Sequence, residues 1–209
     1  MTPEDILSKP PLRLTQAERR FYFENGYLAL PGATPADTLA RIRAKSDEFL
    51  ERSRNVSKSN EVFDLGPNHS SAKPHVRRLR RPVDQDPFFW DIATSDVMTE
   101  IAADLVGPDV KFHSCKLNYK WPGGGELVKW HQDICAWPHT NYSPVTLGIC
   151  LDDVDQAVGP LACVPKSQDG PLYSHFGPDG KWTGHISDAD SDAAGVEAAA
   201  DLIGPAGTI

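Results

Sequence analysis

The sequence has no long apolar run of the kind that forms a membrane-spanning helix. The stretch from Met1 to Leu12 also lacks the basic-then-apolar order of a secretory signal. No two of the four cysteines have the Cys-x-x-Cys spacing that is typical of zinc ribbons. We therefore expect a cytoplasmic protein that has no membrane partner, keeps its cysteines reduced, and contains no disulfide and no structural zinc.

The chain has fewer positive than negative charges, with 21 Lys and Arg against 29 Asp and Glu and a formal net charge of -8 at pH 7. Such a charge repels nucleic acid unless a compact basic patch overcomes it locally. One basic cluster exists, made of Arg77, Arg78, Arg80 and Arg81. Either these arginines are solvated or paired with carboxylates, or one of them turns inward to hold an anionic cosubstrate. We expect no nucleic-acid partner.

Length and composition limit the number of domains. A chain of 209 residues is long enough for one sizeable core, and we expect a single domain over residues 1–209. The 18 prolines and 16 glycines favour many turns over long helices. Helical patterns occupy residues 1–109, and β patterns occupy residues 110–209.

Helix signals dominate the first half of the chain. Thr15 and Glu18 have the spacing of a capping box, and Gly26 can end the helix that they begin. A second helix is expected over residues 34–52, with Thr34 as its cap and a stripe of apolar residues along one face. A third helical stretch covers residues 88–105 and is stopped by a Gly-Pro pair.

The remaining segments lack helical periodicity. Residues 53–74 are rich in Ser and Asn, which predicts a surface loop that could fold over a site entrance. Alternating or short apolar stretches predict strands over residues 27–30, 110–118, 127–133, 144–151, 159–165 and 181–186. Residues 190–203, rich in Ala and Asp, predict a weak helix or a mobile insert.

The most informative motif is His-x-Asp, formed by His131 and Asp133. Side chains two residues apart on an extended strand leave from the same face, so these two converge while Gln132 points away. One further histidine from another strand would complete the facial triad of the non-haem Fe(II) oxygenases. The motif therefore predicts two ligands of a metal site.

Several short motifs follow one another along nearly the whole chain. They are Leu14-Thr15, Asn25-Gly26-Tyr27-Leu28, Lys116-Leu117-Asn118-Tyr119-Lys120, Trp130-His131-Gln132-Asp133, Leu151-Asp152-Asp153 and Gly159-Pro160-Leu161. Together they resemble the phytanoyl-CoA dioxygenase (PhyH) family of Fe(II)- and 2-oxoglutarate-dependent oxygenases. The resemblance implies a mostly β fold whose core is a double-stranded β-helix (a cupin-like jelly roll) with flanking helices.

The resemblance also implies the chemistry. His131 and Asp133 would bind Fe(II), and 2-oxoglutarate would serve as cosubstrate. Its oxidative decarboxylation to succinate by dioxygen would be coupled to hydroxylation of a small organic substrate. The family spans fatty acyl thioesters, amino-acid derivatives and natural products, so the substrate itself is not predicted.

The family places a cosubstrate contact on the strand before the His-x-Asp motif, where this chain has Lys116. A lysine there suits a carboxylate, although it would equally suit a solvent-facing position on an edge strand. Further candidates for cosubstrate binding are Arg78, Asn118 and Thr146. For the substrate pocket, Trp137 either lines the mouth or packs in the core. Gly148 replaces a tryptophan that is frequent in the family, which would leave more room.

The end of the chain departs from the family pattern. In relatives, a Pro-Ala-Gly-Thr segment opens the strand that carries the distal histidine ligand and, later, an arginine for 2-oxoglutarate. Here Pro205-Ala206-Gly207-Thr208-Ile209 opens that strand, and neither residue follows. We expect residues 110–209 to form a jelly-roll part that lacks its last strands, in a truncated form with weak or no activity.

No other histidine is a strong candidate for the third ligand. We expect His113, His139, His175 and His185 to be exposed or hydrogen-bonded. Besides truncation, the site could be completed by another chain, or the protein could be a non-catalytic jelly-roll module that binds a small ligand or partner. A cupin-like metalloenzyme of other chemistry, using Zn or Mn at the same residues, is a further alternative. The sequence does not predict the oligomeric state.

Overall fold

The computed structural model describes residues 1–122, 127–137 and 143–209. Its helices and strands in these ranges are α1 (Pro3–Leu7), α2 (Gln16–Asn25), α3 (Ala36–Ser53), β1 (Phe63–Leu65), β2 (Val76–Arg80), α4 (Pro82–Gln85), α5 (Pro87–Ala93), α6 (Asp96–Val106), β3 (Lys116–Asn118), β4 (Leu161–Cys163), α7 (Asp188–Ala193) and β5 (Ala200–Leu202). Short 3-10 helices cover Asp133–Ala136, Gln156–Val158, Ser167–Asp169 and Val196–Ala198. Within the described residues, none of the helices combines the length and hydropathy needed to cross a bilayer.

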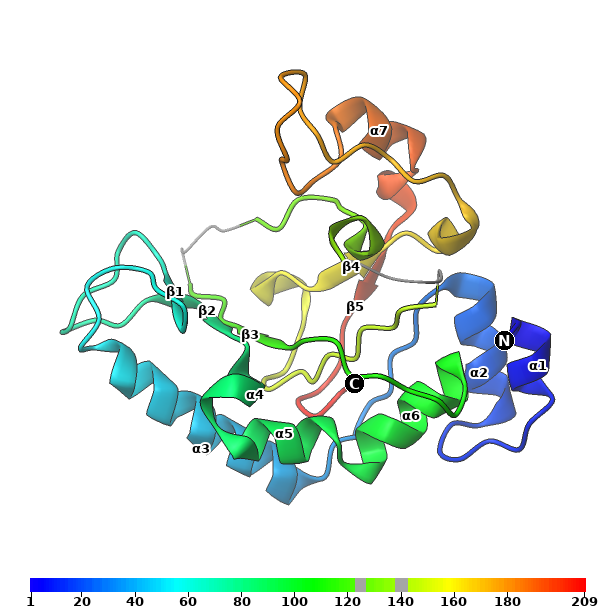
Figure 1. Cartoon of the computed structure of the whole chain (residues 1–209), viewed down its shortest axis with the longest axis horizontal. Helices are drawn as coiled ribbons and strands as arrows, with labels where there is room; N and C mark the ends of the chain where they lie inside the picture. The colour runs from blue at the N-terminus through cyan, green and yellow to red at the C-terminus, as the bar shows by residue number, and fades with distance from the viewer. Residues whose placement is uncertain (123–126, 138–142) are drawn as a thin grey trace.

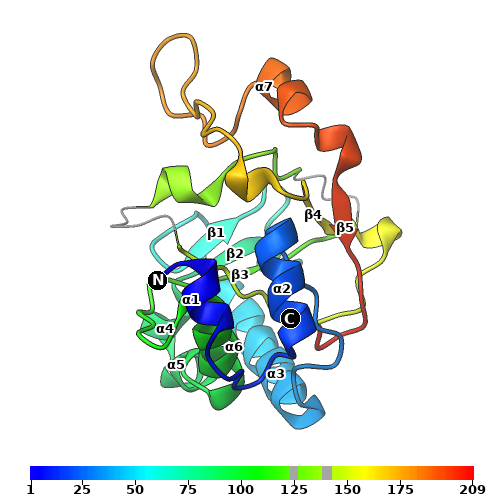
Figure 2. The same ribbon diagram turned by 90° about the vertical axis from the view of Figure 1, so that its right-hand side faces the viewer.

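Two small antiparallel sheets lie between helical layers. Helices α1 to α6 lie on one side of the sheets, and α7 lies on the opposite side (Figures 1 and 2). One sheet has the strand order β1-β2-β3, and the other consists of β4 and β5. In the first sheet, Leu79 pairs with Phe63 and Leu117, whereas Arg78 pairs with Asp64 and Asn118. Because paired residues share a face, this sheet has one apolar and one charged face.

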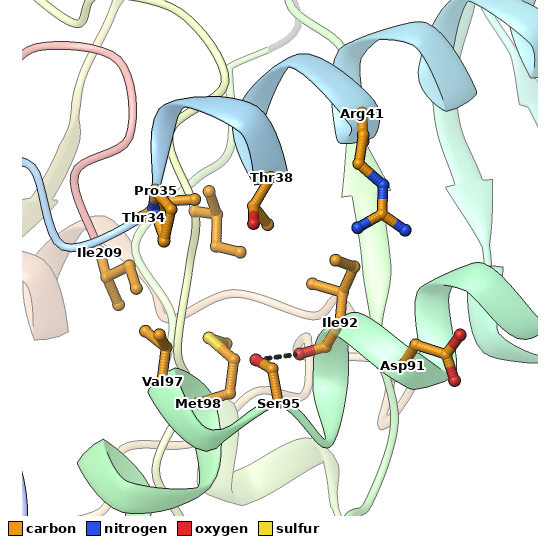
Figure 3. A pocket seen from close by; sticks show the side chains of 11 residues that line it. Thr34, Pro35, Thr38, Arg41, Asp91, Ile92, Ser95, Val97, Met98 and Ile209 are labelled. Carbon is orange, nitrogen blue, oxygen red and sulfur yellow. Dashed lines mark hydrogen bonds between the residues drawn. The ribbon is translucent and has the colours of Figure 1, made fainter.

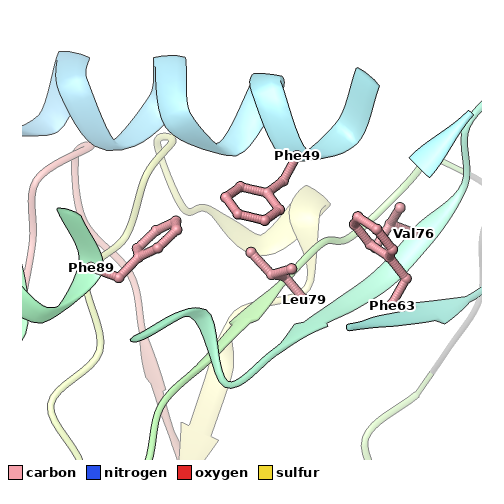
Figure 4. Close-up of a cluster of buried hydrophobic side chains, with 5 residues drawn as sticks. All are labelled: Phe49, Phe63, Val76, Leu79 and Phe89. Carbon is pink, nitrogen blue, oxygen red and sulfur yellow. The ribbon is translucent and has the colours of Figure 1, made fainter. Parts of the chain in front are cut away.

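The apolar face of the three-stranded sheet packs against the helices. Figure 4 shows the cluster, in which Phe49 of α3 and Phe89 of α5 lie against Phe63, Val76 and Leu79 of the sheet. Phe49, Val76 and Leu79 have no exposed surface. Burial of such side chains stabilises a fold by about 1.5 to 3 kcal/mol each. The apolar cluster therefore fixes the sheet on α3 and leaves its charged face pointing away from the helices.

A second apolar cluster positions the extended segment formed by residues 144–150. Val145 and Leu147 pack against Ile101 and Leu105 of α6. In an extended chain, alternate side chains point to opposite sides. Thr146, which lies between Val145 and Leu147, is exposed and therefore points away from the helices.

The helices confirm most of the capping signals. α2 begins after Thr15 with both hydrogen bonds of the predicted capping box, and Gly26 ends it in the left-handed conformation with φ of 83°. The predicted cap at Thr34 is wrong, because Pro35 is the N-cap residue of α3 and no side chain caps this helix. The single helical stretch over residues 88–105 is in fact α5 and α6, because the Ser95 hydroxyl donates to the Ile92 carbonyl where α5 ends.

The strands are shorter than the sequence patterns predict. Residues 27–30, 127–133, 144–151 and 181–186 contain no regular strand in the described parts of the chain, and the strand expected from residue 110 begins only at Lys116. Some of these segments make isolated backbone hydrogen bonds in place of a regular β-ladder. Leu30, for example, exchanges two hydrogen bonds with Ile209, at 2.8 and 3.2 Å. The described residues are accordingly richer in helix than the mostly β prediction.

Two segments predicted as irregular contain strands. Residues 53–74, predicted to be a polar surface loop, include β1, whose Phe63 is buried. Residues 190–203, predicted to be a weak helix or mobile insert, include β5, which pairs with β4 through Leu202 and Leu161. In both cases a strand partner from another part of the chain decides the conformation, which local composition does not report.

A buried polar network joins α6 to the segment before α2. The Asp104 carboxylate accepts the backbone N–H groups of Leu12, Arg13 and Leu14, each at 2.8 Å. The side chain of Arg19 donates to the Asp104 carbonyl at 3.2 Å. Asp104 and Arg19 are only 2% and 1% exposed. Their contacts therefore connect the N-terminal segment to the helix that supports residues 144–150.

We expect Asp104→Ala to destabilise the protein by about 3 kcal/mol, because three backbone N–H donors, that of the buried Leu14 among them, lose a charged acceptor. Urea unfolding followed by circular dichroism measures this change. Asp109→Ala, at an exposed aspartate just beyond α6, is the matched control and should unfold like the wild type. An Asp104→Ala midpoint equal to that of the control would contradict the role given to this carboxylate.

Candidate metal centre

The backbone around the His-x-Asp motif combines an extended residue with a turn. Gln132 has extended angles, φ -112° and ψ 113°, and the 3-10 helix Asp133–Ala136 follows it directly. The Cys135 N–H donates to the Gln132 carbonyl at 3.1 Å. The strand predicted through Asp133 is therefore wrong, yet the predicted convergence is confirmed: Nε2 of His131 lies 3.1 Å from Oδ1 of Asp133.

His131 and Asp133 form a partly exposed pair, with 31% and 36% of their side chains exposed. The His131 Nδ1 is 2.8 Å from the Lys129 carbonyl, which can only accept a hydrogen bond, so Nδ1 carries a proton. The hydrogen bond to Asp133 raises the pKa of His131 against an opposing effect of burial. The same bond lowers the pKa of Asp133. The pair thus favours an imidazolium beside a carboxylate.

Two of the predicted cosubstrate residues lie beside this pair. The Thr146 hydroxyl donates to Oδ2 of Asp133 at 3.5 Å, a long hydrogen bond. The positive charge of Lys116 contributes to the lowered pKa of Asp133 and partly opposes the raised pKa of His131. Lys116 begins β3 and pairs with Arg80. The charged face of the sheet therefore borders the His131–Asp133 pair.

Arg78 and Asn118 lie next along the same charged face. Arg78 Nε donates to Oδ1 of Asn118 at 3.0 Å. Three other arginines of the basic cluster lie near carboxylates: Arg77 and Arg80 are 4.0 and 3.9 Å from Asp64, and Arg81 pairs with Asp84. The carboxylate-paired interpretation is confirmed for those three. Arg78 differs from them because its described partner is an uncharged amide.

The two predicted substrate-pocket residues have different surroundings. A Cβ atom added to Gly148 would meet nothing within 4 Å, so this position leaves open space. By the alternation of residues 144–150, Gly148 shares the side of Thr146. Trp137 follows the 3-10 helix, and its ring centroid lies 5.6 Å from that of His113. Gly148 thus borders the site, whereas a role of Trp137 at a substrate mouth stays a prediction.

The other histidines are engaged elsewhere. His175 is 2% exposed, and its Nε2 accepts the Gln132 N–H at 2.9 Å. His185 Nδ1 lies 2.9 Å from the Ile186 carbonyl, and His113 contacts Trp137. His139 lies outside the described residues. Within residues 1–122, 127–137 and 143–209, no group of three or more His, Cys, Asp or Glu side chains is placed to hold a metal.

Residues 207–209, which the resemblance predicts to open a further strand, lie between two extended segments. The Gly207 N–H donates to the Cys150 carbonyl at 2.8 Å, and the Cys150 N–H donates to the Thr208 carbonyl at 2.8 Å. On the other side, Leu30 pairs with Ile209. Residues 207–209 therefore run between residue 150 and residue 30, beside the segment that carries Thr146 and Gly148.

A cavity of about 160 Å³ lies on the helical side of the same segment. In Figure 3, Thr38 of α3 faces Ser95 across the cavity, and Ile209 closes one end. Ile149 also lines it. Because Ile149 has the parity of Val145 and Leu147, the cavity is on the side opposite Thr146. It is therefore separate from the His131–Asp133 site.

The fold resembles that of a solved structure. EctD from S. alaskensis, solved with bound Fe, superposes with a TM-score of 0.73 at 17% identity, over 97% of this chain and 70% of that one. This likeness defines the fold class, a jelly-roll core, of which the described residues show small antiparallel sheets.

Sequence comparison assigns the family. Residues 22–203 match the family described as phytanoyl-CoA dioxygenase (PhyH), and the chain belongs to this family. A probable alpha-ketoglutarate-dependent hypophosphite dioxygenase of Stutzerimonas stutzeri is 30% identical over 198 residues, covering 92% of this chain and 68% of the relative. A probable phytanoyl-CoA dioxygenase of Caenorhabditis elegans is 26% identical, covering 84% of this chain and 59% of the relative.

The contacts of His131 predict that two substitutions shift its pKa in opposite directions in the metal-free protein. Asp133→Asn should lower the pKa of His131, because the carboxylate hydrogen bond that raises it is lost. Lys116→Met should raise the same pKa, because a nearby positive charge is removed. Titration of the His131 ring by NMR measures both. Lys181→Met, at an exposed lysine that pairs with Asp179, is the control and should change nothing. Shifts of one sign in both test variants would contradict the geometry.

Proposed function

We propose that this protein is an Fe(II)- and 2-oxoglutarate-dependent dioxygenase that hydroxylates a small organic substrate, with His131 and Asp133 as metal ligands. The observation that carries the proposal is the 3.1 Å approach of the His131 Nε2 to the Asp133 Oδ1. Membership of the phytanoyl-CoA dioxygenase family supports it. So does the alpha-ketoglutarate dependence in the name of the S. stutzeri relative.

The donor set fits ferrous iron. A metal-binding histidine normally donates its second ring N–H to a carbonyl or carboxylate, which fixes the ring and the tautomer. For His131 the acceptor is the Lys129 carbonyl, whose oxygen lies 2.8 Å from Nδ1. Nε2 is therefore the nitrogen that faces Asp133. An imidazole and a carboxylate are two donors of a facial triad. A third donor is not among the described residues.

When bound, Fe(II) supplies the redox chemistry that couples 2-oxoglutarate decarboxylation to C–H hydroxylation. The chain supplies positions and charges. Thr146 orients the Asp133 carboxylate through its hydrogen bond to Oδ2. Lys116 provides a positive charge beside the pair and suits a carboxylate of the oxo acid.

Further residues complete the proposed pocket. Arg78 and Asn118 extend the polar surface along β2 and β3 and provide donors for the same cosubstrate. Gly148 leaves space beside Thr146. Trp137 supplies an apolar surface near the end of the motif for a small substrate. Arg78 and Asn118 belong to one side of the sheet, and Gly148 and Thr146 belong to one side of residues 144–150.

Metal binding tests the ligand assignment directly. We expect Co(II), used as a spectroscopic substitute under anaerobic conditions, to bind the 209-residue chain with a visible absorption spectrum of nitrogen and oxygen donors. His131→Ala and Asp133→Ala should each weaken binding by at least about tenfold, because either change leaves one described donor. The matched control is His69→Ala, whose ring contacts Val56 and His75 and not the pair. Wild-type affinity in either ligand variant would exclude this metal site.

Turnover tests the reaction. In the protein at its natural full length, we expect succinate to form from 2-oxoglutarate in the presence of Fe(II) and dioxygen, and both ligand variants to abolish it. Lys116→Met should raise the KM for 2-oxoglutarate by about ten- to a hundredfold, because a hydrogen bond to a charged group contributes about 1.5 to 3 kcal/mol. Lys116→Arg should retain much of the binding. Ligand binding that is indifferent to chelators, without succinate, would instead favour a non-catalytic module.

A further inference from the structure

The residue between the two proposed ligands is held by a distant part of the chain. The side-chain amide of Gln132 donates from Nε2 to the Pro171 carbonyl at 3.0 Å and accepts the Tyr173 N–H on Oε1 at 2.8 Å. Its backbone N–H donates to Nε2 of His175 at 2.9 Å. With the Cys135 N–H on its carbonyl, every polar group of Gln132 has a hydrogen-bond partner.

The His175 ring is held in place by contacts on both nitrogens and on one face. Its Nδ1 lies 3.0 Å from the Tyr173 carbonyl, so Nδ1 is the protonated nitrogen and Nε2 is the acceptor for Gln132. Its ring is stacked on Trp182, with centroids 5.4 Å apart and planes at 15°. The Thr183 hydroxyl also donates to the His175 carbonyl at 2.9 Å. A neutral, buried imidazole with both nitrogens engaged is an anchor for the backbone and not a metal ligand.

A third contact holds the other side of the motif. The Ile186 N–H donates to the Trp130 carbonyl at 3.0 Å. The segment formed by residues 171–186, which we call the clamp segment, therefore bonds the backbone just before His131 and again at Gln132. The two ligand side chains leave this backbone on the opposite side, where they meet.

We propose that His175 and Gln132 are positioning residues that hold the His-x-Asp backbone in the conformation required for metal binding. The inference rests on the proposed function, because it assigns these residues to the same metal site. The physical reason is geometric: ligands must stay within about 0.5 Å of their productive positions, and groups that orient ligands are worth about 10- to 100-fold in metal affinity. Rotation of the Gln132 peptide would move His131 and Asp133 in different directions.

Two substitutions of His175 separate positioning from packing. His175→Gln places an amide oxygen near the position of Nε2, where it can accept the Gln132 N–H. His175→Asn places its amide near the position of Nδ1 and is too short to reach Gln132. Both remove the ring stacked on Trp182. We expect His175→Asn to weaken Co(II) binding by about 10- to 100-fold and to change the visible Co(II) spectrum, and His175→Gln to restore most of the affinity and the spectrum.

Controls distinguish this effect from loss of stability. Trp182→Leu removes the stacking partner but leaves the acceptor, so it should lower the thermal unfolding midpoint and weaken Co(II) binding much less than His175→Asn does. If His175→Asn does not fold, Gln132→Met gives the same test, because it removes both side-chain bonds to the clamp segment from a half-buried position. It should weaken Co(II) binding by about 10- to 100-fold as well.

The outcomes separate the two proposals. If wild-type protein binds Co(II) and His131→Ala abolishes binding, while His175→Asn and Gln132→Met bind like wild type, the positioning role is overturned and the metal site stands. Equal losses in His175→Asn and His175→Gln would also overturn it, because packing alone would then explain the effect. If the wild type binds no Co(II), the metal site fails and this inference fails with it.

Discussion

The site depends on the short distance between the His131 imidazole and the Asp133 carboxylate, 3.1 Å between Nε2 and Oδ1. Two groups separated by one residue meet in this way because Gln132 is extended and the chain turns into a 3-10 helix immediately after it. The Lys129 carbonyl sets which ring nitrogen faces the carboxylate. The backbone conformation of residues 129–133 thus sets the distance on which the proposed metal site depends.

The rest of the fold places polar and charged side chains around that pair, because each extended segment has one apolar and one polar face. The apolar face of the three-stranded sheet packs on α3 and α5, so its other face presents Lys116 and Arg78. The same division applies to residues 144–150, where Val145 and Leu147 pack on α6 and Thr146 points to the carboxylate. Hydrophobic burial on one side is therefore the physical cause of the polar surface on the other.

The accuracy of the sequence-based predictions follows the range of the interactions behind them. α2 was predictable because its capping box joins Thr15 to Glu18, three residues away. The cap at Thr34 failed because the residue that follows is Pro35, which took the cap position itself. β1 escaped prediction because a polar loop composition gives no sign of the distant strand β2 with which Phe63 and Asp64 pair.

The sequence alone determined the spacing of His131 and Asp133, the parity of residues 145–149 and the family, because these depend on neighbours a few positions apart or on motif order. Only the tertiary structure decided the partners. The Arg78 bond to Asn118 spans 40 residues, and the Gln132 bond to His175 spans 43. Nothing in a local pattern encodes such pairs, because they form only when packing of the apolar faces brings separate segments together.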